Sequence, residues 1–168
     1  SKLYSAAASS KHMQQPQWPF IQLQASHTLC QRLYHEELIH LPSITSPTSL
    51  YDFLLSQFCN HTIESFACLF LNAQHQLIQF EHLSQGTINT TVVYPREIVK
   101  RALELNSCSI IAAHNHPSGN TEPSQADIAL TQRIQQALDL FDINLLDHII
   151  VGVGSILSLL HHGLLNNR

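Results

Sequence analysis

The sequence predicts an α/β (α+β) fold in which one mixed β-sheet is flanked by helices. The chain has 168 residues, of which 44% are hydrophobic and only 12% charged, so it can bury a sizeable core. Short apolar runs of strand length alternate with segments of helical periodicity. This alternation is not strictly strand–helix–strand, which favours a mixed sheet with helices packed on it.

The N-terminal part is predicted to contribute no strand. Residues 1–18 are rich in Ser, Ala and Gln without an apolar period, and we expect a flexible arm. Residues 19–42 are expected to form an N-terminal helix that ends before Pro42. Its apolar positions are Ile21, Leu23, Leu29, Leu33, Leu38 and Leu41.

Residues 43–168 are expected to form the main domain. Pro47 suits the first turn of a second helix, which carries Leu50, Phe53, Leu54 and Phe58. Residues 64–71 read E-S-F-A-C-L-F-L, a run typical of a buried strand. Further strands are predicted at 77–83, 88–94, 109–113, 145–153 and 156–160, and further helices at 96–105 and 123–140.

Charge and cysteine content exclude several classes of protein. Eight Lys and Arg against 12 Asp and Glu give a net charge of -4, so we do not expect nucleic acid as a tight direct partner. The four cysteines form no C-x-x-C pair and are expected to be buried free thiols in a reducing cytosol. Without a leader or a bilayer-spanning apolar run, we expect a cytoplasmic protein with no membrane association.

The informative stretch begins at the end of the predicted strand 109–113. In an extended segment, residues two apart point the same way, so His114 and His116 present both imidazoles to one side. Pro117 is expected to end the strand. Asp127 follows a loop that contains Gly and Pro, in the first turn of the next helix, and the loop can fold the carboxylate back towards the histidines.

Two imidazoles and one carboxylate leave one coordination position open, which is typical of a catalytic zinc site. The metal lowers the pKa of bound water to about 7, and a carboxylate that is not a ligand can take its proton. Glu64, at the start of an apolar strand, is a candidate for this general base.

Each of these residues also has a simpler interpretation. Ser124 and Asp127 satisfy the S-x-x-[DE] capping box of a helix N-terminus. His-x-His arises easily by chance among 12 histidines, and Glu64 could be an ordinary charge at a strand end. Asp147 and His148 could support the site, but a hydrogen-bonded strand pair is the preferred interpretation. The joint occurrence of strand, H-x-H-P, loop and S-x-x-D favours the metal site.

With these motifs the chain resembles the RadC family, the bacterial branch of the JAB/MPN (JAMM) metalloprotease-like fold. The JAMM signature is an upstream Glu, then H-x-H-P, six residues, Ser, two residues and Asp, which matches Glu64, residues 114–117, Ser124 and Asp127. RadC-like details are H-N-H-P-S-G at 114–119, G-T at 86–87, Y-P-R-E at 94–97 and L-D-H-I-I at 146–150. The resemblance covers residues 43–160.

The resemblance implies a JAB/MPN (cytidine deaminase-like) architecture with Zn²⁺ on His114, His116 and Asp127. It implies Glu64 as the acid/base and Ser124 as a hydrogen-bond donor to the oxyanion. The expected function is a zinc-dependent hydrolase of the metallopeptidase or isopeptidase type, in which metal-bound water attacks an amide carbonyl of a peptide or protein substrate. Asn115 is the RadC form, so the substrates of eukaryotic JAMM enzymes do not transfer.

The resemblance also suggests that residues 19–42 are the remnant of a linker to a missing helix-hairpin-helix module. The main alternative function is a DNA repair or recombination accessory protein of the RadC type. A non-haem Fe(II) oxygenase shares the donor set, and a non-catalytic scaffold would be expected to lose ligands. The sequence leaves the oligomeric state open, with a homodimer as one candidate.

Overall fold

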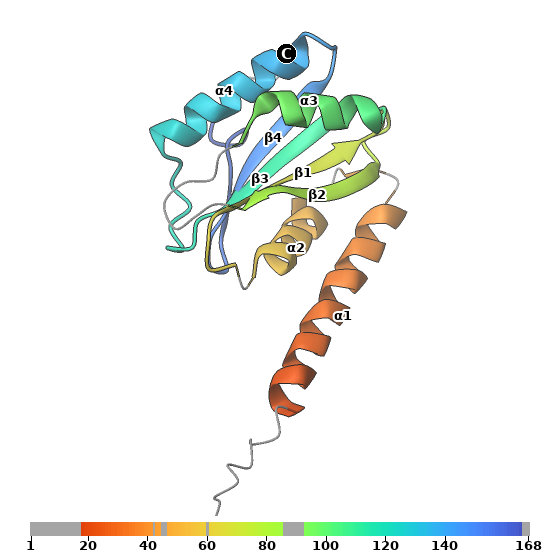
Figure 1. Cartoon of the computed structure of the whole chain (residues 1–168), viewed down its shortest axis with the longest axis vertical. Helices are drawn as coiled ribbons and strands as arrows, with labels where there is room; N and C mark the ends of the chain where they lie inside the picture. Colours follow the sequence, from red (N-terminus) through yellow and green to blue (C-terminus); the bar gives the residue numbers. More distant parts are fainter. Residues whose placement is uncertain (1–17, 42, 45–46, 60, 86–92, 166–168) are drawn as a thin grey trace, which may run out of the picture.

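The structure is a computed structural model that describes residues 18–41, 43–44, 47–59, 61–85 and 93–165. It confirms the predicted fold class, a mixed sheet flanked by helices (Figure 1). The elements in chain order are α1 Trp18–His40, α2 Pro47–Phe58, β1 Ser65–Leu71, β2 Leu77–Gln85, α3 Pro95–Glu104, β3 Ser109–Asn115, α4 Gln125–Asp139, β4 Asn144–Val151 and β5 Ile156–Ser158.

The sheet has the strand order β2-β1-β3-β4-β5. Strand β1 runs antiparallel to both β2 and β3, and β5 runs antiparallel to β4. Only β3 and β4 are parallel among the described strands, and α4 makes the crossover that a parallel pair needs. The strand that ends in the histidines therefore lies at the centre of the sheet.

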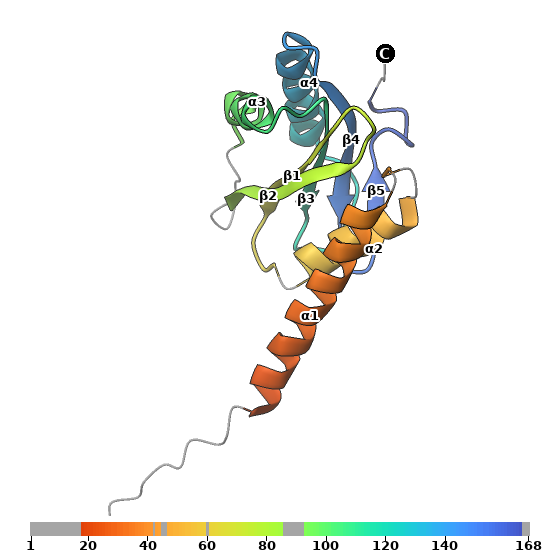
Figure 2. The ribbon, with the colours of Figure 1, turned by 90° about the vertical axis from the view of Figure 1, so that its right-hand side faces the viewer.

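Helices cover both faces of the sheet, with α3 and α4 on one face and α2 on the other (Figure 2). Side chains of β3 alternate between the two cores: Ile110 and Ala112 pack towards α3 and α4, and Ile111 and Ala113 pack towards α2. The same period of two directs His114 to the α4 face and Asn115 to the α2 face. This alternation decides which helix can meet the histidines.

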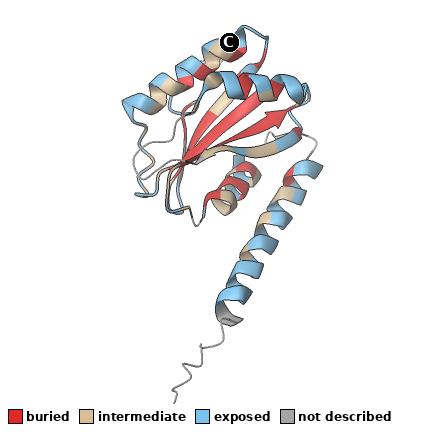
Figure 3. Ribbon diagram, in the orientation of Figure 1, coloured by how far each residue is buried: buried red, intermediate tan, exposed pale blue. Residues whose placement is uncertain are grey.

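The two N-terminal helices differ in how well the sequence predicted their packing. The four predicted apolar residues of α2 are all buried. In α1, by contrast, Leu38 is buried but Leu23 and Leu33 are exposed, as are Ile21 and Leu29 (Figure 3). The prediction of a helix is confirmed, but its apolar positions do not form a buried face, because most of α1 extends beyond the edge of the sheet (Figure 1).

Several boundaries differ from the prediction. Residues 88–92 of the predicted strand 88–94 lie outside the described part of the chain, and Val93 and Tyr94 lie in no strand. Residues 1–17 of the predicted arm also lie outside the described part of the chain, and its last residue, Trp18, begins α1. Strand β4 ends at Val151, since the chain turns at 152–155.

The cysteine prediction was wrong for three of four residues. All four are free thiols, but only Cys68 is buried, in β1, whereas Cys30, Cys59 and Cys108 are exposed. Their positions on α1 and at the ends of elements explain this exposure. No helix in the described ranges combines the length and apolar character needed to span a bilayer.

Candidate metal centre

The two histidines lie where β3 passes into a loop. His114 is buried and lies next to the last residue of β3. His116 follows the strand, and its backbone N–H donates to the carbonyl oxygen of Val151 at 2.9 Å. Gly119 then reverses the chain with a φ of +83°, a value that favours glycine. Because β3 is central and held on both sides, the backbone that carries both imidazoles is fixed.

Asp127 is positioned by the cap of α4. The Ser124 hydroxyl accepts a hydrogen bond from the Asp127 N–H at 3.1 Å, and Asp127 Oδ2 accepts one from the Ser124 N–H at 2.8 Å. The capping box suggested by the sequence is therefore present. It also orients the Asp127 carboxylate, whose two oxygens lie near His114 and His116 at the end of β3.

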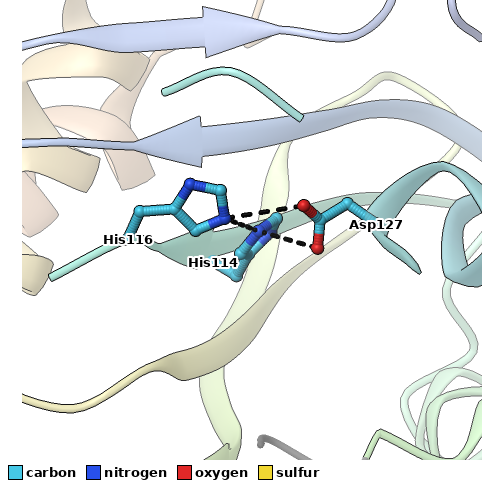
Figure 4. A group of neighbouring side chains, drawn as sticks. All are labelled: His114, His116 and Asp127. Atoms are coloured by element: carbon cyan, nitrogen blue, oxygen red, sulfur yellow. Dashed lines mark hydrogen bonds and ion pairs between the residues drawn. The ribbon is translucent and has the colours of Figure 1, made fainter. Parts of the chain in front are cut away.

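His114, His116 and Asp127 bring their donor atoms together at one point (Figure 4). The two Nε2 atoms are 3.0 Å apart, His114 Nε2 lies 3.3 Å from Asp127 Oδ1, and His116 Nε2 lies 3.5 Å from Asp127 Oδ2. In a tetrahedral zinc site with bonds near 2.0–2.1 Å, neighbouring donors are about 3.3 Å apart. The three separations are close to this spacing, with His114 facing Oδ1 and His116 facing Oδ2 of Asp127.

The hydrogen bonds of His116 determine which of its nitrogens carries a proton. Its Nδ1 lies 2.7 Å from the carbonyl oxygen of Asn120, which can only accept. Nδ1 must therefore be the donor, so a neutral His116 presents a bare lone pair at Nε2. This lone pair faces His114 and Asp127.

His114 is fixed in the same way by a buried chain of hydrogen bonds. The Thr131 hydroxyl donates to the carbonyl oxygen of Asp127 at 2.7 Å, so it accepts from His148 Nδ1 at 2.5 Å. Burial lowers the pKa of His148 well below its ordinary value, so its ring is neutral and its Nε2 must accept from His114 Nδ1 at 2.8 Å. A neutral His114 therefore also presents a bare Nε2.

When both rings are neutral, two imidazole lone pairs and a carboxylate converge with no proton between them. Such a group repels itself unless a cation or an extra proton lies at its centre. Burial raises the pKa of Asp127, but hydrogen bonds with His114, His116 and Ser124 outweigh it and hold the pKa far below its usual range. The hydrogen bond to Asp127 raises the pKa of His116, against burial. This donor set could bind a metal ion.

Glu64 lies beside this group just before β1. In the antiparallel register Phe66 faces His114, and Glu64 lies two residues before Phe66 in the chain. Glu64 also lines a small cavity of about 50 Å³ together with His114 and Asp127, large enough for a water molecule. Its negative charge contributes to the raised pKa of His116, after the larger effect of the Asp127 hydrogen bond.

Asn115 holds the segment that carries Glu64. From the opposite face of β3, its side chain accepts from the Ser65 N–H at 2.8 Å and donates to the carbonyl oxygen of Ile63 at 3.1 Å. It therefore fixes the backbone on both sides of Glu64. The sequence analysis treated Asn115 only as a family variant and gave it no structural role.

For Asp147 and His148, the sequence analysis preferred a hydrogen-bonded strand pair over a role in supporting the site. Asp147 does fit that preference, since its carboxylate accepts from the Ser158 hydroxyl and the Leu160 N–H. His148 instead contacts His114. The signal available in the sequence was a histidine inside an apolar strand, which needs a buried partner.

Fold and site together define a class: a protein with a mixed sheet whose central strand and neighbouring helix present a His-x-His and Asp group able to hold a metal. Comparison with known families gives the same class, because the RadC-like JAB domain matches residues 44–164. The chain belongs to the RadC-like JAB domain family, which confirms the predicted resemblance.

Similar proteins include UPF0758 proteins of Chromohalobacter salexigens, Cellvibrio japonicus and Pseudomonas fluorescens. They are 49%, 48% and 47% identical to the chain over 144 residues. These alignments cover 86% of this chain but only 64% of each relative. The chain therefore spans somewhat less than two-thirds of their length.

Proposed function

We propose that the protein is a zinc-dependent hydrolase of the JAMM metallopeptidase type that cleaves an amide bond in a peptide or protein. The observation that carries this proposal is the convergence of His114 Nε2, His116 Nε2 and the Asp127 carboxylate, at separations close to the donor spacing of a bound zinc ion. A donor set of three protein groups leaves a fourth position for water or substrate, in contrast to a closed structural site.

The metal would be held by His114, His116 and Asp127. A bound Zn²⁺ supplies Lewis-acid chemistry, polarising a carbonyl and lowering the pKa of water to about 7. Nitrogen and carboxylate donors also suit Fe²⁺, so the choice of zinc rests on the family resemblance.

Glu64 is proposed as the general acid/base. Its place beside the small cavity that His114 and Asp127 also line would let it take a proton from the attacking water and return it to the leaving amine. The Asn115 bonds to Ser65 and Ile63 support this role, since they hold the Glu64 backbone in one position.

Ser124 is proposed as the donor to the oxyanion of the tetrahedral intermediate. In this structure its single hydroxyl hydrogen goes to Asp127 Oδ2 at 2.6 Å. Donation to substrate would require the hydroxyl to exchange that partner, while the Ser124 N–H continues to hold Asp127.

Metal analysis and a peptidase screen of the protein and its Glu64→Gln variant test the proposal. We expect one zinc per chain in both proteins, and a fall in kcat of about 10²- to 10⁴-fold in the variant. Glu37→Gln, on the exposed surface of α1, is the matched control and should leave kcat unchanged. Protein that binds no metal, or cleavage that survives in Glu64→Gln, would overturn the proposal.

The alternatives predict other outcomes in the same experiments. Turnover that needs iron and O₂ would support an oxygenase. Tight, salt-dependent binding to duplex DNA would support the repair accessory role, which the net charge of -4 disfavours.

A further inference from the structure

A second, larger cavity lies directly beside the candidate metal centre. It has a volume of about 710 Å³, within the range of ligand-binding pockets, and is open on one side. One wall is formed by Leu55 and Phe58 of α2, and the other by Pro117 and Val153 in the loops that follow β3 and β4. Glu64, Ser124 and Asp127 do not line this cavity.

The lining of the cavity combines apolar side chains with the polar side chains of His61, Thr62, Asn115 and His116. Its described residues include no Asp, Glu, Lys or Arg, and the only titratable rings are His61 and His116. Burial, and then the nearby His27, lowers the pKa of His61, so this ring is neutral at pH 7. The cavity therefore favours an apolar ligand over a charged one.

His116 connects the cavity with the candidate metal centre. Its ring lines the cavity, while its Nε2 faces His114 and Asp127. Asn115 also borders the cavity and holds the segment with Glu64. A peptide whose side chain occupies the cavity would therefore pass its backbone over His116.

The two loops that line the cavity pack closely against each other. A side chain at Gly152 would collide with the carbonyl oxygen of Gly119, so the turn after β4 packs tightly on the loop that carries His116 and Pro117. Val153 stands at the rim and is 80% exposed. Val153 thus adds apolar surface to the lining of the cavity.

We infer that this cavity binds apolar side chains of the substrate next to the cleaved amide bond. The protein thus selects peptide segments with residues such as leucine at that position. This inference rests on the proposed hydrolase function, because the substrate is taken to be a peptide. The position of the cavity beside His116 and its lack of charge favour this occupant.

Binding can be measured without catalysis by titrating the ¹⁵N-labelled Glu64→Gln protein with two capped dipeptides. We expect N-acetyl-leucyl-leucine amide to shift the amide signals of Gly152, Val153 and Gly154 saturably. N-acetyl-seryl-serine amide should bind about 10- to 100-fold more weakly, because it loses the burial of apolar side chains.

Val153→Asp in the same background should weaken leucyl-leucine binding by about tenfold or more. Leu140→Asp is the matched control, since Leu140 is also 80% exposed but lies at the end of α4, away from the cavity. Thermal melting of both variants shows whether the fold is kept. Equal binding of both dipeptides, shifts centred on another surface, or unchanged binding in Val153→Asp would overturn the inference.

A cleavage screen separates the two proposals. Leucine-selective binding without any metal-dependent cleavage would leave the cavity assigned and refute the hydrolase. Glu64-dependent cleavage with no preference for apolar residues, unaffected by Val153→Asp, would support the hydrolase and refute the cavity assignment.

Discussion

Replacing His148 by leucine removes the partner that fixes the proton of His114. Leucine is similar to histidine in size but neither donates nor accepts a hydrogen bond. In the variant, the proton on His114 Nδ1 has no acceptor at 2.8 Å, and leaving a buried donor unpaired costs about 1–3 kcal/mol. Moving the proton to Nε2 avoids this cost, because Asp127 Oδ1 can accept it there.

That tautomer removes the lone pair that a metal needs, so zinc affinity should fall. Loss of a group that orients a ligand typically weakens metal binding by 10- to 100-fold, or about 1.4–2.7 kcal/mol. The measurement is competition for Zn²⁺ against a chromophoric chelator at neutral pH. Thr131→Val, which breaks the far end of the same chain, should have a smaller effect.

Thr131→Ser is the control for this series, because it keeps the hydroxyl that bonds His148 and Asp127. Its zinc affinity should stay close to that of the unmodified protein, whatever the cost of its missing methyl group to stability. The tautomer argument would be refuted if His148→Leu bound zinc as tightly as the unmodified protein, or if Thr131→Ser lost as much affinity as Thr131→Val.

Two further predictions concern pH and the position of Glu64. The raised pKa of His116 gives the metal-free protein stability that is complete below about pH 6.5 and lost as the pH rises through the folded-state value. The lowered pKa of Asp127 gives stability that is complete above about pH 4 and lost progressively as the pH falls below that value. Urea unfolding across pH should therefore show a loss of stability above about pH 6.5 that Asp127→Asn lacks, and identical profiles would contradict the ion pair. Asn115→Ala should lower the free energy of unfolding by about 1–3 kcal/mol and reduce kcat while zinc affinity changes little, and an unchanged kcat would show that Asn115 does not position Glu64.

The sequence predicted the elements that carry a clear period. Helix α2 and its four buried residues follow from apolar spacing, and β1 and β3 follow from short continuous apolar runs. The exposure of α1 could not be predicted in this way. Its apolar residues indicated a buried face, but most of the helix extends beyond the sheet and has nothing to pack against there. Periodicity reports what a segment could bury and not whether a partner is there.

For the site, the sequence determined that His114 and His116 point to the same side of the chain, and that Asp127 belongs to the first turn of a helix. Both follow from local geometry, which depends on residues a few positions apart. The sequence could not show which face of the sheet they use, since that depends on the parity of the whole strand against two cores.

Only the tertiary structure decided that His148, 34 residues beyond His114, lies within hydrogen-bonding distance of it. Strands β3 and β4 pair in parallel with Ala112 opposite His148, and a register shift at Ile110 and Ile111 sets that alignment. One residue of slip would turn the His148 ring to the α2 face. The tautomer of His114 is therefore a property of strand register, which no local pattern in the chain contains.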